Sequence, residues 1–242
     1  MRQAHVPASG AGQYDRGRLA VFSCPSHPAS PRATKRTNTG YRITTVMQFE
    51  YLETERLRLR LLTQDIYRHV FLHFSVPEQK AFFGQENEAE LAMERLRGLG
   101  GMETYRSTIR YFHLLDKETG RTLGSCGYHN WYPGHRRAEI GYALTATSLR
   151  GNGLMREALA RVLEYGFAEM NLNRVEALIG AGNEPSLRLV RRFGFSQEGV
   201  LRQHWNVDGV LHDSLVFSLL ESEYTQAHNS RAQHPAPSEA EQ

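Results

Sequence analysis

The chain has 242 residues, which at roughly one domain per 150 residues allows one large domain but not two of equal size. Apolar residues make up 40% of it and charged residues 23%, so it can bury a core without covalent staples, and a wholly disordered or fibrous chain is excluded. Its two cysteines, Cys24 and Cys126, are too few for a disulfide framework or a four-ligand zinc site. A reducing, cytoplasmic setting is therefore expected.

The net charge of +3 and the pI near 8.9 originate in the first 46 residues. Residues 1–46 hold seven basic side chains and one acid, so the remaining residues carry a charge of −3. This leader is rich in Gly, Ser, Pro and Ala and is predicted to be disordered, and its apolar cluster at 19–22 is too short for a signal peptide or a membrane span. It is either a transit peptide or an upstream extension before a working start at Met47, which we favour. We therefore expect neither nucleic acid nor a membrane as a partner.

Ordered patterning begins where charge and leucine alternate between Arg56 and Leu62, as in a half-buried strand. The expected elements are a strand at 56–62, helices at 65–74 and 86–97, strands at 109–116, 121–130 and 136–144, a helix at 153–170, a strand at 174–180, a helix at 183–192, and strands at 195–207 and 210–220. The three strands after residue 108 read as an antiparallel meander, and the last two as a hairpin around Asp208-Gly209. This predicts an α/β (α+β) domain over 47–224 and a loose polar tail over 225–242.

The segment 149–157 gives the clearest indication of a ligand-binding site. It lies between a strand and a long helix, so its backbone N–H groups and the positive end of the helix dipole point to one place, which favours phosphate. Gly151 and Gly153 permit close backbone approach, and Arg150 adds charge. A Walker A loop needs Lys and Ser/Thr where Leu154 and its neighbour stand, and a third glycine or alanine for a dinucleotide fingerprint is missing. An ordinary strand-to-helix turn is the alternative.

Six segments, in the same order, resemble the GCN5-related N-acetyltransferase (GNAT) superfamily, and within it the RimJ/RimL-like branch of ribosomal-protein-alanine N-acetyltransferases. They are LETERLRLRLL, RRAEIGYAL, the RGNG turn with the Glu-Ala that follows it, NEPSLRLVRRFGF, EGVLR and the Asp-Gly hairpin, and they span about residues 52–222. The resemblance implies a mixed, mostly antiparallel central sheet flanked by helices, with acetyl-CoA in the splay between the fourth and fifth strands.

The resemblance also implies where acetyl-CoA is bound. The implied contacts are Tyr142, Ala143 and Leu144 for the pantetheine arm; Arg150, Gly151, Asn152, Gly153, Leu154 and Met155 for the pyrophosphate; Asn183 and Ser186 of the N-x-x-S motif; and Arg192, with Arg191, for the phosphates of the nucleotide. Asn183 also suits a helix N-cap, and both roles can coexist. The arginine pair is equally typical of a solvated helix face.

Acetylation of an amine needs a base for the amine proton and an acid for the departing thiolate. Many superfamily members use a tyrosine where this chain has Val190, so the resemblance shifts the acid role to Ser186. Glu139 is the best-placed carboxylate for a base that acts through water; its alternative role is a salt bridge to Arg136 or Arg137.

The leading acceptor is the N-terminal amine of a protein, which titrates near 8 and needs less help than a lysine near 10.4. The alternatives are a small amine, such as an aminoglycoside, polyamine or amino-acid derivative, and a non-catalytic acetyl-CoA-binding module. An acidic pocket would favour a polycationic small molecule, and a shallow open groove a peptide terminus. The aromatic stretches 81–84 and 127–133 suit an acceptor slot or, more commonly, core packing.

No metal site is expected. His113 and His129 have no second ligand at zinc spacing and read as strand histidines, and Cys126 reads as a small core residue rather than a nucleophile. We expect a monomer or a homodimer, between which the sequence does not choose.

Overall fold

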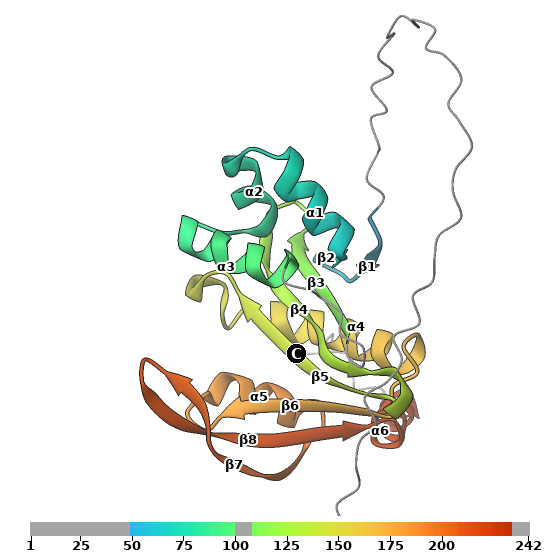
Figure 1. Cartoon of the computed structure of the whole chain (residues 1–242). Helices are drawn as coiled ribbons and strands as arrows, with labels where there is room; N and C mark the ends of the chain where they lie inside the picture. The colour runs from blue at the N-terminus through green and yellow to red at the C-terminus, as the bar shows by residue number, and fades with distance from the viewer. Residues whose placement is uncertain (1–48, 100–107, 234–242) are drawn as a thin grey trace, which may run out of the picture. The chain divides into compact units, whose positions relative to one another are not determined.

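A computed structural model describes residues 49–99 and 108–233 of the chain, and the predicted leader lies outside them. The described part is a mixed α/β structure built on one eight-stranded sheet with helices on both faces (Figure 1). The strands are β1 (Tyr51–Glu53), β2 (Leu57–Leu62), β3 (Thr108–Asp116), β4 (Thr122–Tyr132), β5 (Arg137–Leu144), β6 (Arg174–Gly180), β7 (Ser196–Val207) and β8 (Val210–Leu220). The α-helices are α1 (Gln64–His73), α2 (Val76–Phe83), α3 (Glu88–Leu99), α4 (Leu154–Ala168), α5 (Glu184–Arg192) and α6 (Glu221–Gln233), with short 3₁₀ turns η1 (Pro133–His135) and η2 (Thr147–Leu149).

The sheet order is β1-β2-β3-β4-β5-β6-β8-β7, and every pairing is antiparallel except β5 with β6. The predicted meander and closing hairpin are confirmed, as is the mixed, mostly antiparallel sheet. The parallel ladder between β5 and β6 ends at Glu139 opposite Glu176, although both strands continue. Beyond that pair β5 stays with β4 and β6 stays with β8, so the sheet opens at its centre.

Two hydrophobic cores lie on opposite faces of this sheet, because successive strand side chains point to alternate faces. The main core joins alternate residues of β2 to β6 to the apolar face of α4, including Ala158, Leu159, Val162 and Leu163. These α4 residues are spaced three and four apart in sequence, so they share one face of the helix, and all four are buried. The second core holds α1 and α2 over Leu62 on the other face.

Three elements were not predicted: β1, α2 and α6. The signal for α2 is present, because Pro77 lies in its first turn and the Glu78 carboxylate accepts the Ser75 N–H at 2.7 Å, as in a capping box. The prediction of a loose tail from residue 225 is wrong at its start, since α6 continues to Gln233. Gly98 was expected to end a helix, but it is buried inside α3, where its missing side chain admits the Tyr67 ring.

His113 on β3 is expected to make folding pH-dependent. Burial, together with the positive charges of Arg60 and Arg97, holds the pKa of His113 well below its ordinary value of 6.5. Below pH 6.5 the His113 side chain therefore binds a proton in the unfolded chain but not in the folded chain. The free energy of unfolding falls as the pH drops below 6.5, by up to about 1.4 kcal/mol per pH unit.

The measurement is the free energy of unfolding in urea at pH 7.0, 6.2 and 5.5. In a His113→Gln variant the unfolding free energy should change less steeply with pH, by up to the contribution of one bound proton. This difference distinguishes the effect of His113 from that of the other histidines. Equal slopes in the two proteins would contradict the assignment.

Candidate active site

The opening between β5 and β6 exposes one edge of β5. Tyr142, Ala143 and Leu144, predicted to contact the pantetheine arm, lie beyond the last residue of β5 that pairs with β6. Within the described residues no strand pairs with them on that side, while β4 pairs with them on the other. An extended ligand can add to such an edge as an extra strand, using backbone hydrogen bonds.

Tyr142, on this open edge of β5, has an unsatisfied polar group in its side chain. Its hydroxyl is buried and has no hydrogen-bond partner within the described residues. Burial raises the pKa of Tyr142, and the nearby Ser186 side chain on α5 offsets part of that rise. The two hydroxyls thus lie close together without a hydrogen bond of standard geometry. A buried hydroxyl without a partner costs about 1–3 kcal/mol, which a bound ligand can recover.

The turn from Arg150 to Met155 has the geometry expected of a phosphate-binding loop. Gly151 and Gly153 have φ values of +83° and +75°, which side chains disfavour, and Gly153 is the N-cap of α4. The first backbone hydrogen bond of α4 runs from the Glu157 N–H to the Gly153 carbonyl, so residues 154–156 keep unpaired N–H groups. These donors and the helix dipole favour an anion.

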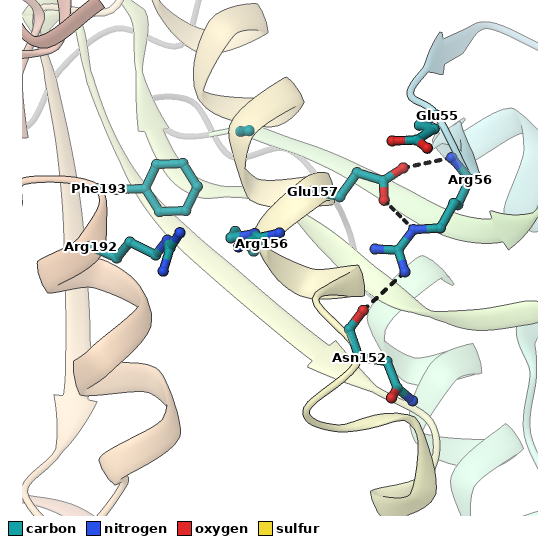
Figure 2. A pocket seen from close by; sticks show the side chains of 8 residues that line it. Glu55, Arg56, Asn152, Arg156, Glu157, Arg192 and Phe193 are labelled. Carbon is teal, nitrogen blue, oxygen red and sulfur yellow. Dashed lines mark hydrogen bonds and ion pairs between the residues drawn. The ribbon is translucent and has the colours of Figure 1, made fainter. Parts of the chain in front are cut away.

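A cavity of about 740 Å³ adjoins this loop and contains three arginines (Figure 2). Arg56 is neutralised, because its Nε lies 2.7 Å from Glu157 Oε2, and its Nη1 donates to the Asn152 carbonyl at 2.9 Å. Arg156 and Arg192 face one another across the cavity, and neither has an ion-pair partner within the described ranges. This places uncompensated positive charge beside the loop.

Of these arginines only Arg192 was predicted at the cofactor. Arg156 could have been found from its place in the first turn of the helix after the loop. Arg56 could not, because its partner is 101 residues away. Arg191, which was named with Arg192 for the phosphates, has its guanidinium 5.9 Å from the centre of the Phe217 ring.

Asn183 caps α5: its Oδ1 accepts the backbone N–H of Ser186 at 3.3 Å. The predicted N-cap role is therefore confirmed, and the predicted contact with the pantetheine amide stays a prediction. Met155 and Leu154 are half-buried and pack against the main core, so they would offer a ligand their backbone.

Glu139 lies at the vertex of the opening, on the face of β5 opposite Tyr142. Its two oxygens meet His129 Nε2 at 3.1 Å and Asn130 Nδ2 at 3.0 Å. Burial raises the pKa of Glu139, but the hydrogen bonds from His129 and Asn130 and the charges of His129 and His204 outweigh it, leaving the pKa below its ordinary value. Glu139 is therefore ionised at neutral pH.

The alternative partners predicted for Glu139 are engaged elsewhere. Arg137 donates to Glu176 at 2.8 Å, and Arg136 donates to the carbonyl and side chain of Asn171, both at 2.9 Å. Neither forms an ion pair with Glu139, so the alternative salt bridge is absent from the described structure.

A second cavity, of about 490 Å³, lies on the Glu139 face of the sheet, between α3 and β3 to β5. Its lining includes Ala143 and Leu144 of β5 and three acids: Glu86, Glu90 and Glu94. Glu94 is bound by Tyr67 and Arg97, both at 2.5 Å, whereas the other two have no cationic partner within the described residues.

The predicted acceptor slot at 81–84 is largely core, which was the more common alternative. Phe83 is buried against Tyr67 and Phe71, and Phe82 lies under the Arg60 guanidinium at 3.6 Å. Phe83 and Gly84 nevertheless reach the edge of the second cavity. Cys126 is buried, and burial raises its pKa, as expected for a core thiol.

These features fit acetyl-CoA. The open β5 edge and the unpartnered Tyr142 hydroxyl suit an extended amide-containing arm, and the loop with Arg156 and Arg192 suits phosphates. Within residues 49–99 and 108–233, no group of three or more His, Cys, Asp or Glu side chains could hold a metal ion. None of the helices in these ranges is long and apolar enough to cross a bilayer.

A family model described as acetyltransferase (GNAT) domain matches residues 56–196. The chain is 34% identical over 174 residues to YoaA of Bacillus subtilis, an uncharacterised N-acetyltransferase, covering 71% of this chain and 97% of YoaA. It is 30% identical to YdaF of the same species, a candidate ribosomal N-acetyltransferase, covering 68% and 98%. Mutant forms of the spermidine/spermine N-acetyltransferase SpeG of Vibrio cholerae share the fold, with a TM-score of 0.54 at 23% identity, covering 72% of this chain and 98% of SpeG.

Proposed function

Because the chain belongs to the GNAT acetyltransferase family, we propose that it transfers an acetyl group from acetyl-CoA to the N-terminal α-amine of a protein, as in the RimJ/RimL-like branch. The observation that carries this proposal is the opening between β5 and β6. It combines an unpaired backbone edge and an unpartnered Tyr142 hydroxyl with ionised Glu139 at its vertex.

The residues that would hold the cofactor lie along this opening. Backbone groups of 142–144 would bind the pantetheine arm, and Asn183 would bind one of its amides through its Nδ2. The N–H groups of the turn at 150–155 would bind the pyrophosphate, and Arg192 and Arg156 the outer phosphates. Bound there, acetyl-CoA supplies a thioester whose carbonyl carbon accepts an amine.

Acid and base would then act from opposite faces of β5. The Glu139 end of the site lies on the face of the second cavity, through which we propose the amine enters. The Ser186 hydroxyl lies on the other face, beside Tyr142, and would give its proton to the departing sulfur. The proton taken from the amine and the proton given to the sulfur would thus move on opposite faces of β5.

An α-amine suits this site because it titrates near 8 and needs only a mild base. Two carboxylates pair at the vertex, Glu139 and its parallel neighbour Glu176, and Glu176 is bound by two arginines. The similarity to YdaF, which extends over nearly its whole length, supports a protein acceptor.

A small polycationic amine is the second candidate. Glu86 and Glu90 place uncompensated negative charge on the lining of the second cavity, which favours an acceptor with more than one positive charge. A basic peptide and a polyamine both meet this condition, so the choice between them needs a direct assay.

The test is release of free CoA from acetyl-CoA with a panel of acceptors. The panel holds a basic peptide with a free N-terminal alanine, the same peptide with a blocked N-terminus, spermidine, and an aminoglycoside. Turnover of the free peptide but not the blocked one supports the proposal. Turnover of spermidine alone favours the second candidate, and no turnover with any amine overturns both.

Removal of Arg192 or Arg156 should weaken acetyl-CoA binding. Each guanidinium would make a charge-assisted hydrogen bond to phosphate worth about 1.5–3 kcal/mol, so we expect the Kd to rise about 10-fold or more in Arg192→Ala and in Arg156→Ala. The effect should shrink in high salt.

Isothermal titration with acetyl-CoA measures both variants. Arg188→Ala is the matched control, because Arg188 is on the same helix as Arg192 but is exposed and pairs only with Glu184, at 3.9 Å. An unchanged Kd in both cavity variants would place the nucleotide elsewhere.

A further inference from the structure

We propose that the group that accepts the amine proton is the imidazole of His129, and that Glu139 is the positioning residue that orients it. This inference rests on the proposed acetyl transfer to an amine and names the base within it. It replaces the expectation that Glu139 itself acts as the base through water.

The His129 ring is held by a partner directly across the sheet. His129 on β4 and Glu139 on β5 are register partners in the antiparallel ladder, so their side chains share one face. Nε2 of the ring lies 3.1 Å from Glu139 Oε1, and Asn130 Nδ2 holds the other carboxylate oxygen at 3.0 Å. Both oxygens of Glu139 are therefore engaged, and this carboxylate is a poor candidate to take a further proton.

The second ring nitrogen, Nδ1, is the one left for chemistry. The ring lies on the backbone of Gly141: a Cβ built there would be 2.9 Å from Cε1 and 3.0 Å from Nδ1 of His129. Only glycine leaves this space. In the neutral ring that donates its Nε2–H to Glu139, Nδ1 keeps a lone pair, and it has no hydrogen-bond partner within the described residues.

The position of Nδ1 in the sheet matches the reacting centre. Glu139 is the last residue of β5 that pairs with β6, and Gly141 is two residues further, where the strands have separated. Nδ1 therefore lies beside the mouth of the opening, on the face of the second cavity. A thioester lying along β5 and an amine entering from that cavity would meet next to it.

The chemistry of the two groups also favours the imidazole. Although burial raises the pKa of Glu139, its hydrogen bonds leave that pKa below the ordinary value, so the carboxylate has a weak affinity for a proton. Histidine is also the side chain that most often serves as a general base in enzymes.

Four strands contribute charged or titratable groups near the pair. They are Tyr111 on β3, Arg137 on β5, Glu176 on β6 and His204 on β7. Arg137 and Glu176 compensate each other at 2.8 Å, and His204 Nδ1 lies 3.0 Å from the Ser214 hydroxyl. The carboxylate that orients His129 is thus Glu139 alone among the described residues.

The proton balance is then complete. The nitrogen of the neutral amine forms the C–N bond to the acetyl carbon as its N–H proton passes to His129 Nδ1. The C–S bond breaks, and the sulfur takes the proton of the Ser186 hydroxyl. Ser186 regains a proton from solvent, and His129 releases its own to solvent, so that both residues are restored.

The test is a double-mutant cycle on kcat with the best acceptor of the panel. We expect His129→Gln to lower kcat by about 10²–10⁴-fold with the acetyl-CoA Kd unchanged, and Glu139→Gln to lower it less. The double variant should cost no more than His129→Gln alone, because Glu139 acts only through His129. His212→Gln, an exposed histidine on β8, is the control and should keep wild-type kcat.

The reverse order, a large loss in Glu139→Gln with near-wild-type His129→Gln, would overturn the proposal in favour of Glu139. An independent readout needs no substrate: ¹⁵N NMR of histidine-labelled protein should show His129 as the Nε2–H tautomer in the wild type and as a mixture in Glu139→Gln. A wild-type Nδ1–H tautomer would also overturn it. If no amine is turned over, the proposed function fails, and the NMR result still decides the tautomer.

Discussion

Ser186→Ala is expected to lower kcat about 100-fold while the Kd for acetyl-CoA stays within about twofold of wild type. The reason is that the Ser186 hydroxyl is a proton donor on the α5 face of the opening, near the buried Tyr142 hydroxyl. It would protonate the leaving sulfur in the transition state, so its loss affects the chemical step and not the binding of the ground state.

The Ser186→Ala substitution removes the hydroxyl without disturbing α5, because only the backbone of Ser186 takes part in the helix cap. The Asn183 cap accepts the N–H of residue 186, which alanine retains, and alanine is a good helix former. The measurements are steady-state kinetics, with isothermal titration for acetyl-CoA. Ser230→Ala on α6, whose hydroxyl donates only to the Gln226 carbonyl, is the matched control. Wild-type kcat in Ser186→Ala would remove Ser186 from the mechanism.

Gly166→Ala is expected to lower the free energy of unfolding by at least about 2 kcal/mol. Gly166 is buried in α4, and a Cβ there would lie 2.2 Å from the Tyr128 hydroxyl oxygen. Tyr128 is fully buried, and its hydroxyl donates to the Val162 carbonyl at 2.9 Å, so the ring cannot move away freely. The added methyl must therefore separate α4 from β4.

Helix propensity alone predicts that Gly166→Ala raises the free energy of unfolding, since alanine is favoured over glycine by up to about 1 kcal/mol inside a helix. Urea denaturation of the wild type and the variant decides between the two expectations. Gly134→Ala in η1 is the control, because a Cβ there meets nothing within 4 Å, and it should change stability by less than about 0.5 kcal/mol. A Gly166→Ala protein as stable as wild type would show that α4 packs more loosely against β4 than described.

Several of these features could be predicted from local pattern. The alternation from Arg56 to Leu62 and the apolar face of α4 identified their elements because periodicity reports which side chains are buried. The glycine-rich turn before α4 was predicted because its function depends on backbone geometry, which glycine positions and the helix start reveal. The helix at the start of the tail was missed because α6 shows almost no apolar periodicity. Nothing in its pattern therefore distinguishes it from a loose segment.

The sequence by itself determined the order of most strands and helices, the family and the glycine-rich turn before α4, since each depends on residues that are neighbours in the chain. The tertiary structure decided which charges remain available. Arg56 is neutralised by Glu157 and Arg137 by Glu176, while Arg156 and Arg192 have no ion-pair partner in the part of the chain that the structure describes. It also decided that Glu139 faces His129 and not its neighbouring arginines. These outcomes depend on strand register and on distances between residues far apart in sequence, because hydrogen bonds and ion pairs act only within a few ångströms.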